Sequence, residues 1–260
     1  MPLTLPEPVT DRLTNSPLKL VVCQIRFEET PAVTDAKIGL AFFNSLGGAT
    51  GPYPQFSEFH GEQVDITVAP GSSISAQKTQ LTGWRCVSED QNWSVVLLPN
   101  GVSLETKAYT SWTDDFEARL RTILASLVEH VNPAVRMRLG LRYVDVLVRA
   151  GVKSPRDWQG WILDSFLGPA LHPQLGPAVL AAQQQLEIDA DNGMRCTLRH
   201  GTVLDGATGS PAYLLDWDIH DDAPVSFDQG DILGSLLDFN RLAVRLFQSA
   251  ITPQLFDELK

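Results

Sequence analysis

Two long amphipathic stretches, each following a run of β-strand patterns, restrict the possible folds most strongly. Apolar residues recur at spacings of three and four over residues 111–130 and again over 229–250. This periodicity predicts two helices that each bury one face. Such helices need an apolar surface to pack against, and strand patterns dominate the segments between them. We therefore predict an α+β fold in which antiparallel sheets pack against the long helices.

The order of the predicted elements repeats along the chain. After an extended leader over 1–17, the segment 18–133 reads as strand, helix, three strands and a long helix, and 134–260 repeats this order. We therefore predict two similar α+β halves, although direct identity between them is poor. The long strand expected at 136–148 could pair with the strand expected at 18–27, which would merge the halves into one domain.

The remaining elements are predicted from alternation, turn residues and caps. In chain order we expect a helix at 34–46, a loop at 47–61, strands at 64–70, 73–81, 83–89, 93–99 and 102–109, a helical stretch at 157–168, strands at 179–189, 195–204 and 212–221, and a short helix from 253. Asn100-Gly101 suits a type I′ hairpin, and Asn192-Gly193 also suits a hairpin turn.

Charge and the absence of targeting segments exclude several classes of function. The chain has 20 Lys and Arg against 31 Asp and Glu, a net charge of −11, spread over both halves. Such a charge repels phosphate backbones and anionic membranes, so we expect neither a nucleic-acid nor a membrane partner. No run of about 18 apolar residues is present, and the start lacks the basic and apolar regions of a signal peptide. We therefore expect a cytoplasmic protein.

The sequence shows no assembled catalytic or metal-binding motif. Cys23, Cys86 and Cys196 are isolated, odd in number and without metal-ligand spacing, so they are expected to be small buried hydrophobes. The five histidines form no HExxH motif, and nucleophile-elbow, P-loop, dinucleotide-binding and kinase signatures are missing. We expect no catalytic residue, metal or cofactor.

A stripe of arginines on one predicted strand is the main candidate ligand site. Strand alternation places Arg136, Arg138 and Arg142 on one face, with Met137 and Tyr143 on the other. Three guanidinium groups in a row could bind a phosphate or carboxylate ligand through forked hydrogen bonds. The same stripe could instead be structural.

The structural alternative pairs this stripe with the acidic strand at 212–220. Asp216, Asp218 and His220 also share one face of their strand, and ion pairs between neighbouring strands are common in sheets. We favour this interpretation of the six residues over ligand binding. Carboxylates at short spacing could also hold Mg²⁺ or Ca²⁺, here Asp216, Asp218, Asp221 and Asp222 with His220, but metal binding is disfavoured because no Ca²⁺-loop ligand pattern is present.

Several segments also resemble a known family. They are Pro17 with VVCQIRF (21–27), the WSVVLLP–VSLETKAY–SWTDDF run (93–116), MRLGLRYVDVL (137–147) and LDFNRLAVRLFQSAIT (237–252). The chain resembles a sporadically distributed bacterial family of proteins of about this length with no established activity. The resemblance implies a bacterial, cytosolic, full-length unit, and the patchy distribution suggests an accessory or defence-related role.

Two functional hypotheses follow. The first is a non-catalytic binding protein that recognises a protein or peptide partner through an exposed sheet edge or a groove between the halves. The second is a small-molecule or anion-binding protein, or an enzyme, that uses the arginine-lined face. The oligomeric state cannot be derived from these patterns.

Overall fold

The fold was derived from a computed structural model that describes residues 3–67, 75–190 and 192–260. The chain has an α+β fold, as predicted, although four strands rather than three lie between the first helix and the first long helix. The strands are β1 (Leu18–Phe27), β2 (Gln55–Thr67), β3 (Ser75–Val87), β4 (Trp93–Leu98), β5 (Gly101–Thr106), β6 (Val135–Val148), β7 (Gln183–Asp189), β8 (Arg195–Leu204), β9 (Pro211–Asp221) and β10 (Val225–Ser226). The helices are α1 (Ala36–Ser45), α2 (Glu117–His130), α3 (Asp164–Leu167), α4 (Gln229–Ala250) and α5 (Pro253–Leu259).

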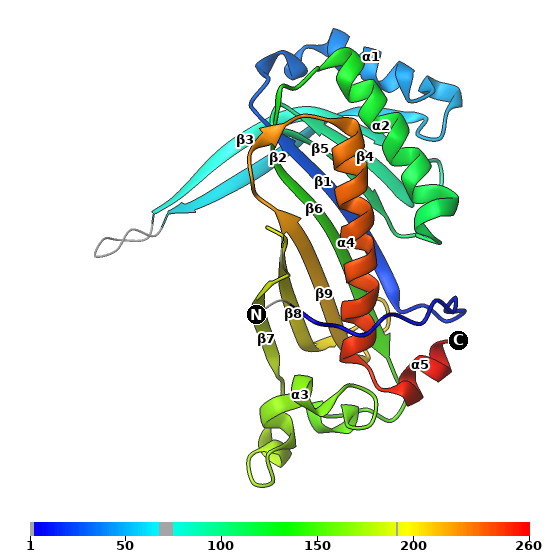
Figure 1. Cartoon of the computed structure of the whole chain (residues 1–260), viewed down its shortest axis with the longest axis vertical. Helices are drawn as coiled ribbons and strands as arrows, with labels where there is room; N and C mark the ends of the chain where they lie inside the picture. Colours follow the sequence, from blue (N-terminus) through cyan, green and yellow to red (C-terminus); the bar gives the residue numbers. More distant parts are fainter. Residues whose placement is uncertain (1–2, 68–74, 191) are drawn as a thin grey trace.

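These strands belong to one ten-stranded sheet, in the order β2-β3-β4-β5-β1-β6-β9-β8-β7, with β10 beside β6 (Figure 1). The prediction of separate sheets is therefore wrong. The alternative is confirmed, because β1 pairs antiparallel with β6 along most of its length, from Leu18↔Asp145 to Phe27↔Arg136. This central pair joins the strands of both halves into one continuous ladder.

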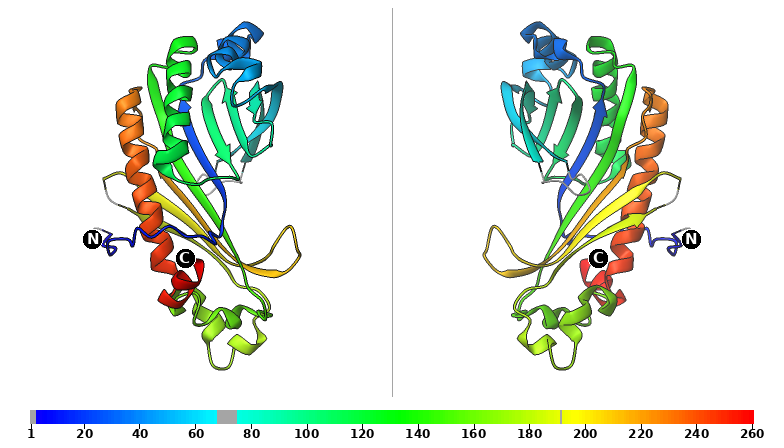
Figure 2. Two further views of the ribbon diagram at one scale, coloured as in Figure 1. Left: turned by 90° about the vertical axis from the view of Figure 1, so that its right-hand side faces the viewer. Right: turned by 90° about the vertical axis from the view of Figure 1, so that its left-hand side faces the viewer.

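The long helices α2 and α4 cover one face of the sheet, and none of the described helices covers the other face (Figure 2). On β6 the odd-numbered residues from Leu139 to Leu147 are buried under the helices, whereas Arg138, Arg142 and Val144 on the other face are partly exposed. The hydroxyl of Tyr143 donates to Asn240 of α4 at 2.8 Å, which identifies the odd-numbered face as the helix side.

Both long helices form where the amphipathic period predicts them. Helix α4 spans Gln229–Ala250, and Asp228 caps it by accepting from the backbone of Asp231. Helix α2 is preceded by one π-helical turn over Trp112–Phe116, so the regular helix begins later than predicted. Thr252 caps α5 as expected.

Several local predictions need correction. The predicted loop at 47–61 is wrong from Gln55 onward, because β2 begins there and pairs with β3 throughout. The strands predicted at 73–81 and 83–89 form one strand, β3, and residues 68–70 and 73–74 of two predicted strands lie outside the described residues. Neither Asn100 nor Gly101 has a positive φ, so their turn is not type I′. Asn192 and Gly193 do have positive φ, at 52° and 82°.

The leader is extended and is attached to the C-terminal helices. Val9 exchanges two hydrogen bonds with the side chain of Gln248 on α4, at 2.9 and 2.8 Å. The backbone of Asn15 donates to the carbonyl of Leu259 at 3.0 Å. Among the helices of the described segments, none combines the length and apolar content needed to cross a membrane.

A close contact fixes helix α1 against β3. The indole nitrogen of Trp84 donates to the carbonyl of Val33 at 2.6 Å. The ring then lies against Gly39 of α1, where a Cβ atom would come within 2.4 Å of the indole. Glycine at this position therefore allows the helix to approach the sheet.

Candidate functional site

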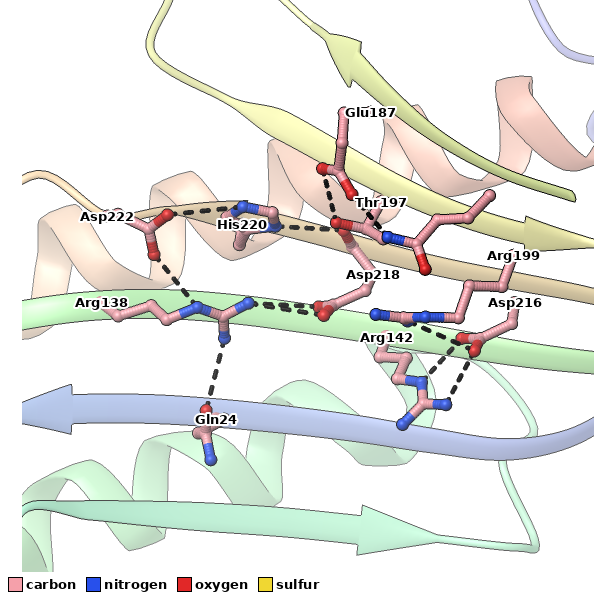
Figure 3. Close-up of polar contacts among 11 residues, drawn as sticks. Gln24, Arg138, Arg142, Glu187, Thr197, Arg199, Asp216, Asp218, His220 and Asp222 are labelled. Carbon is pink, nitrogen blue, oxygen red and sulfur yellow. Dashed lines mark hydrogen bonds and ion pairs between the residues drawn. The ribbon is translucent and has the colours of Figure 1, made fainter. Parts of the chain in front are cut away.

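The candidate site lies on the uncovered face of the sheet, where β9 runs between β6 and β8 (Figure 3). Alternation places Arg138 and Arg142 of β6 on this face, as predicted. Asp218 of β9 lies directly opposite Arg142. Because the register is regular, Asp216 and His220, two residues away on either side, also share this face.

Asp216 is the most buried charge of the group. Its side chain is only 4% exposed, and Arg142 holds both of its oxygens, with Nε 2.6 Å from Oδ1 and Nη2 2.7 Å from Oδ2. This forked contact is the geometry in which guanidinium and carboxylate groups bind most strongly. The hydrogen bond to Asp216 raises the pKa of Arg142 above its usual value.

A second guanidinium approaches the same carboxylate from β8. Arg199 lies directly opposite Asp216 in the β8–β9 register, and its Nη1 is 3.6 Å from Oδ2 of Asp216. The side chains of Arg142 and Arg199 are 42% and 43% exposed, so both present part of a guanidinium to solvent. Two positive charges thus surround one buried negative charge.

Arg138 lies at the other end of the group and contacts two carboxylates. Its Nη2 is 3.4 Å from Oδ2 of Asp218, and its Nε is 3.1 Å from Oδ1 of Asp222. The imidazole of His220 completes the cluster, with Nε2 3.4 Å from Oδ2 of Asp222. Gly140 leaves room for this arrangement, because a Cβ there would lie 2.5 Å from Nη1 of Arg138.

Arg136 does not belong to this face, and its predicted place in the stripe is wrong. Arg26 pairs with Arg138 but Phe27 pairs with Arg136, so Met137 is an extra residue in a β-bulge. The bulge reverses the alternation, which leaves Met137 42% exposed and Arg136 5% exposed on the helix side. There Nη2 of Arg136 is 2.6 Å from Oδ2 of Asp221.

The ion pairs predicted between the arginine strand and the acidic strand are present. Arg142 with Asp216, and Arg138 with Asp218, join β6 to β9. Over the described segments, no group of three or more His, Cys, Asp and Glu side chains is arranged to hold a metal ion. The arrangement is therefore a charge network that lies across three neighbouring strands, and whether it binds a ligand stays a prediction.

Two contributors were missed from the sequence, Gln24 and Arg199, whereas Asp222 was considered there only as a candidate cation ligand. Gln24 accepts from Nη1 of Arg138 at 3.3 Å. Arg199 and Gln24 come from strands whose register against β9 and β6 cannot be read from one sequence. Strand alternation alone would have placed Arg199 on one face with Thr197, but not opposite Asp216.

The thiols lie apart from this face. Cys23, Cys86 and Cys196 are free and buried, as predicted. Burial raises the pKa of Cys86 and of Cys196 to about 12 in each case. A thiol with such a pKa is almost entirely protonated at neutral pH and is a poor nucleophile.

Comparison with known proteins shows no family. No family model matches the chain, and no curated protein matches it. Among solved structures, the di-domain ARO/CYC StfQ from the steffimycin biosynthetic pathway aligns over 87% of this chain and 96% of its own, with 8% sequence identity and a TM-score of 0.19. A likeness at this level carries no argument about fold or function.

Proposed function

We propose that this is a non-catalytic binding protein that recognises a protein partner through the charged, uncovered face of its sheet. The observation that carries the proposal is the ion-pair network of Arg138, Arg142, Arg199, Asp216 and Asp218 on the face opposite the long helices. Paired charges held on a rigid sheet form a fixed pattern, and such patterns give specificity and correct orientation in protein association.

The mixed signs of this face favour a protein over a nucleic acid or a membrane. Each arginine is accompanied by a carboxylate, so the face lacks the uniform positive charge that binds phosphate backbones. The raised pKa values of the buried thiols support a binding role over thiol catalysis. The three free cysteines are also compatible with the reducing cytoplasm, which we include in the proposal.

Charge reversal at the partly exposed Arg199 tests this proposal. The wild-type protein, immobilised, should retain one or more proteins from a lysate of its native cell at low salt. Arg199→Glu should lose them while it keeps one cooperative thermal transition and the circular dichroism spectrum of the wild type; its melting temperature should fall by a few degrees, because a second carboxylate then lies opposite the buried Asp216. Arg241→Glu is the matched control, because Arg241 is 67% exposed on α4.

The possible results distinguish binding at this face from general electrostatic attraction. Retention of the same proteins by Arg199→Glu, or no protein above background with the wild type, would contradict the proposal. Loss with both variants would point to general electrostatic attraction rather than to this face.

A second candidate function is binding of a small organic or inorganic anion. It is favoured by one observation: Arg142 and Arg199 both approach the single carboxylate of Asp216, so two partly exposed guanidiniums share one carboxylate at this end of the network. Titration with citrate and with inorganic phosphate should then give saturable heat that Arg199→Ala abolishes. Binding unchanged by Arg199→Ala would exclude this site for the anion.

The relation between the two halves and the family membership are proposals as well. Support for duplication is topological: β1 and β6 are adjacent at the centre, β5 flanks β1 and β9 flanks β6, and a long helix, α2 or α4, follows the strands of each half. Membership of the sporadic bacterial family, with an accessory or defence-related role, rests on the sequence resemblance alone.

A further inference from the structure

Strand β7 has one side that no other strand of the described residues covers. It ends the strand order of the sheet and forms the outer border of its lower half (Figure 1). Its seven residues, QQQLEID, pair with β8 without a shift in register. Native edge strands are commonly protected by Pro, by charged side chains (Lys above all) or by a bulge; β7 has no Pro, Lys or bulge, and its only charges are the acids Glu187 and Asp189.

The outward-pointing backbone groups of β7 can be identified from the bonds at its two ends. The backbone of Thr202 donates to the carbonyl of Ala182 at 2.8 Å, and that of Ala190 donates to the carbonyl of Met194 at 2.9 Å. Hydrogen-bonded pairs alternate along an antiparallel ladder, so the even-numbered residues between these pairs also bond to β8. The residues whose N–H and C=O groups point outward are therefore Gln183, Gln185, Glu187 and Asp189.

The order of side chains on β7 matches a second copy of the same strand. We infer that two copies of this chain pair through antiparallel β7 strands about a twofold axis at Leu186. In that register Gln183 faces Asp189 of the other copy, Gln185 faces Glu187, and Leu186 faces Leu186. Each acid then lies opposite an amide. Nε2 of Gln183 already donates to the carbonyl of Thr202 at 3.3 Å and that of Gln185 to Glu187 of its own strand at 3.1 Å, and the second N–H of each amide can donate to the acid opposite.

Twofold registers with the axis at a residue near Leu186 give a less favourable strand pair. An axis at Glu187 or at Ile188 places acid opposite acid, which destabilises a strand pair. An axis at Gln184 or at Gln185 leaves Asp189 beyond the end of the paired segment. The two acids of β7 therefore select a register in which no acid lies directly opposite another, and only the two Glu187 residues are diagonal neighbours across the axis.

The central residue also fits this pairing. Leu186 is 44% exposed, although it is an apolar residue in the middle of a strand. Across the axis the two Leu186 side chains would form a pair without hydrogen bonds between them, in which side chains approach most closely. A twofold axis normal to the sheet keeps both uncovered faces on one side. The charged face of Figure 3 would thus continue across both copies.

Cysteine cross-linking with light scattering tests the inference. The wild-type protein should change from monomer to dimer with rising micromolar concentration. Under mild oxidation Leu186→Cys should form a covalent dimer, because the native cysteines are buried and cysteines facing each other in such a pair are close enough for a disulfide. Leu204→Cys is the matched control, since Leu204 is 72% exposed on β8, and it should cross-link far less.

A charge at the axis provides the second variant. Leu186→Lys would place two ammonium groups face to face and should weaken dimerisation at least about tenfold, whereas Leu204→Lys should leave it unchanged. A protein that stays monomeric with no Leu186→Cys cross-link overturns the inference. So does a dimer that Leu186→Lys leaves intact, or a co-purifying peptide on β7. None of these results depends on the charge network. A failure of the dimer inference therefore does not contradict the proposed partner binding, which the Arg199 variant tests separately.

Discussion

Replacing Arg142 with alanine tests the charge network most directly. The substitution removes both close hydrogen bonds to Asp216, whose side chain is 4% exposed. Removing one partner of a fully buried ion pair costs about 3–5 kcal/mol. The cost here is smaller, because Arg142 itself is 42% exposed and Arg199 stays beside the carboxylate. We expect a loss of about 2 kcal/mol in the free energy of unfolding, which for a chain of this size lowers Tm by about 6 °C.

The measurement is urea denaturation followed by tryptophan fluorescence at pH 7, with calorimetry for Tm. Arg199→Ala is the control, and its loose, exposed contact should be worth less than about 1 kcal/mol. The double variant Arg142→Ala/Asp216→Ala should recover part of the loss, because it removes the unpaired carboxylate as well. If Arg142→Ala stays within about 0.5 kcal/mol of wild type, or if Arg199→Ala costs as much, the assignment of the network as structural is wrong.

Three further predictions concern a buried carboxylate, two glycines in helices, and the two halves of the chain expressed separately. Burial raises the pKa of Asp145 from 3.8 to about 8, so the folded state keeps a proton that the unfolded chain releases. Wild-type stability should therefore fall as pH rises from about 4 to about 8, and Asp145→Asn should remove this decline in urea midpoints measured at pH 5 and pH 8. Gly39→Ala should cost about 1–3 kcal/mol by forcing a methyl group into the indole ring packed against α1. Gly234→Ala, in α4 with open space around its Cα, should instead add about 0.5–1 kcal/mol, and equal effects in thermal melts would contradict both assignments. Residues 18–133 and 134–260, expressed separately, should each lack cooperative unfolding by circular dichroism, because each alone exposes one side of the central strand pair.

Sequence patterns were sufficient to predict an element when the residues that stabilise it lie within that element. Helix α4 was predicted with its observed bounds, because the apolar residues that recur along its sequence are the residues that the helix buries. Helix α5 was predicted from Thr252 and Pro253, whose capping and fixed φ act within one turn. The first part of strand β2, residues 55–61, was missed, because GPYPQFSEFHG lacks strict alternation and becomes a strand through its pairing with β3.

The residues of the candidate site also fall into those that the sequence could place and those that only strand pairing could place. The shared face of Arg138 and Arg142, and that of Asp216, Asp218 and His220, follow from alternation within single strands. The position of Arg136 does not, because the bulge at Met137 exists only through the pairing of β6 with β1. Arg199 likewise joins the site only through the register of β8 against β9.

The amino-acid sequence by itself determined the long helices and most of the strands, which residues share a face within a regular strand, and that no familiar catalytic or metal motif is present. Tertiary structure decided that the strands form one sheet, that Arg136 turns toward the helices, and that two guanidiniums surround Asp216. The physical reason is that periodicity is a property of neighbouring residues, whereas register depends on hydrogen bonds between strands distant in the chain. Shifting a strand by one residue would send each of its side chains to the opposite face.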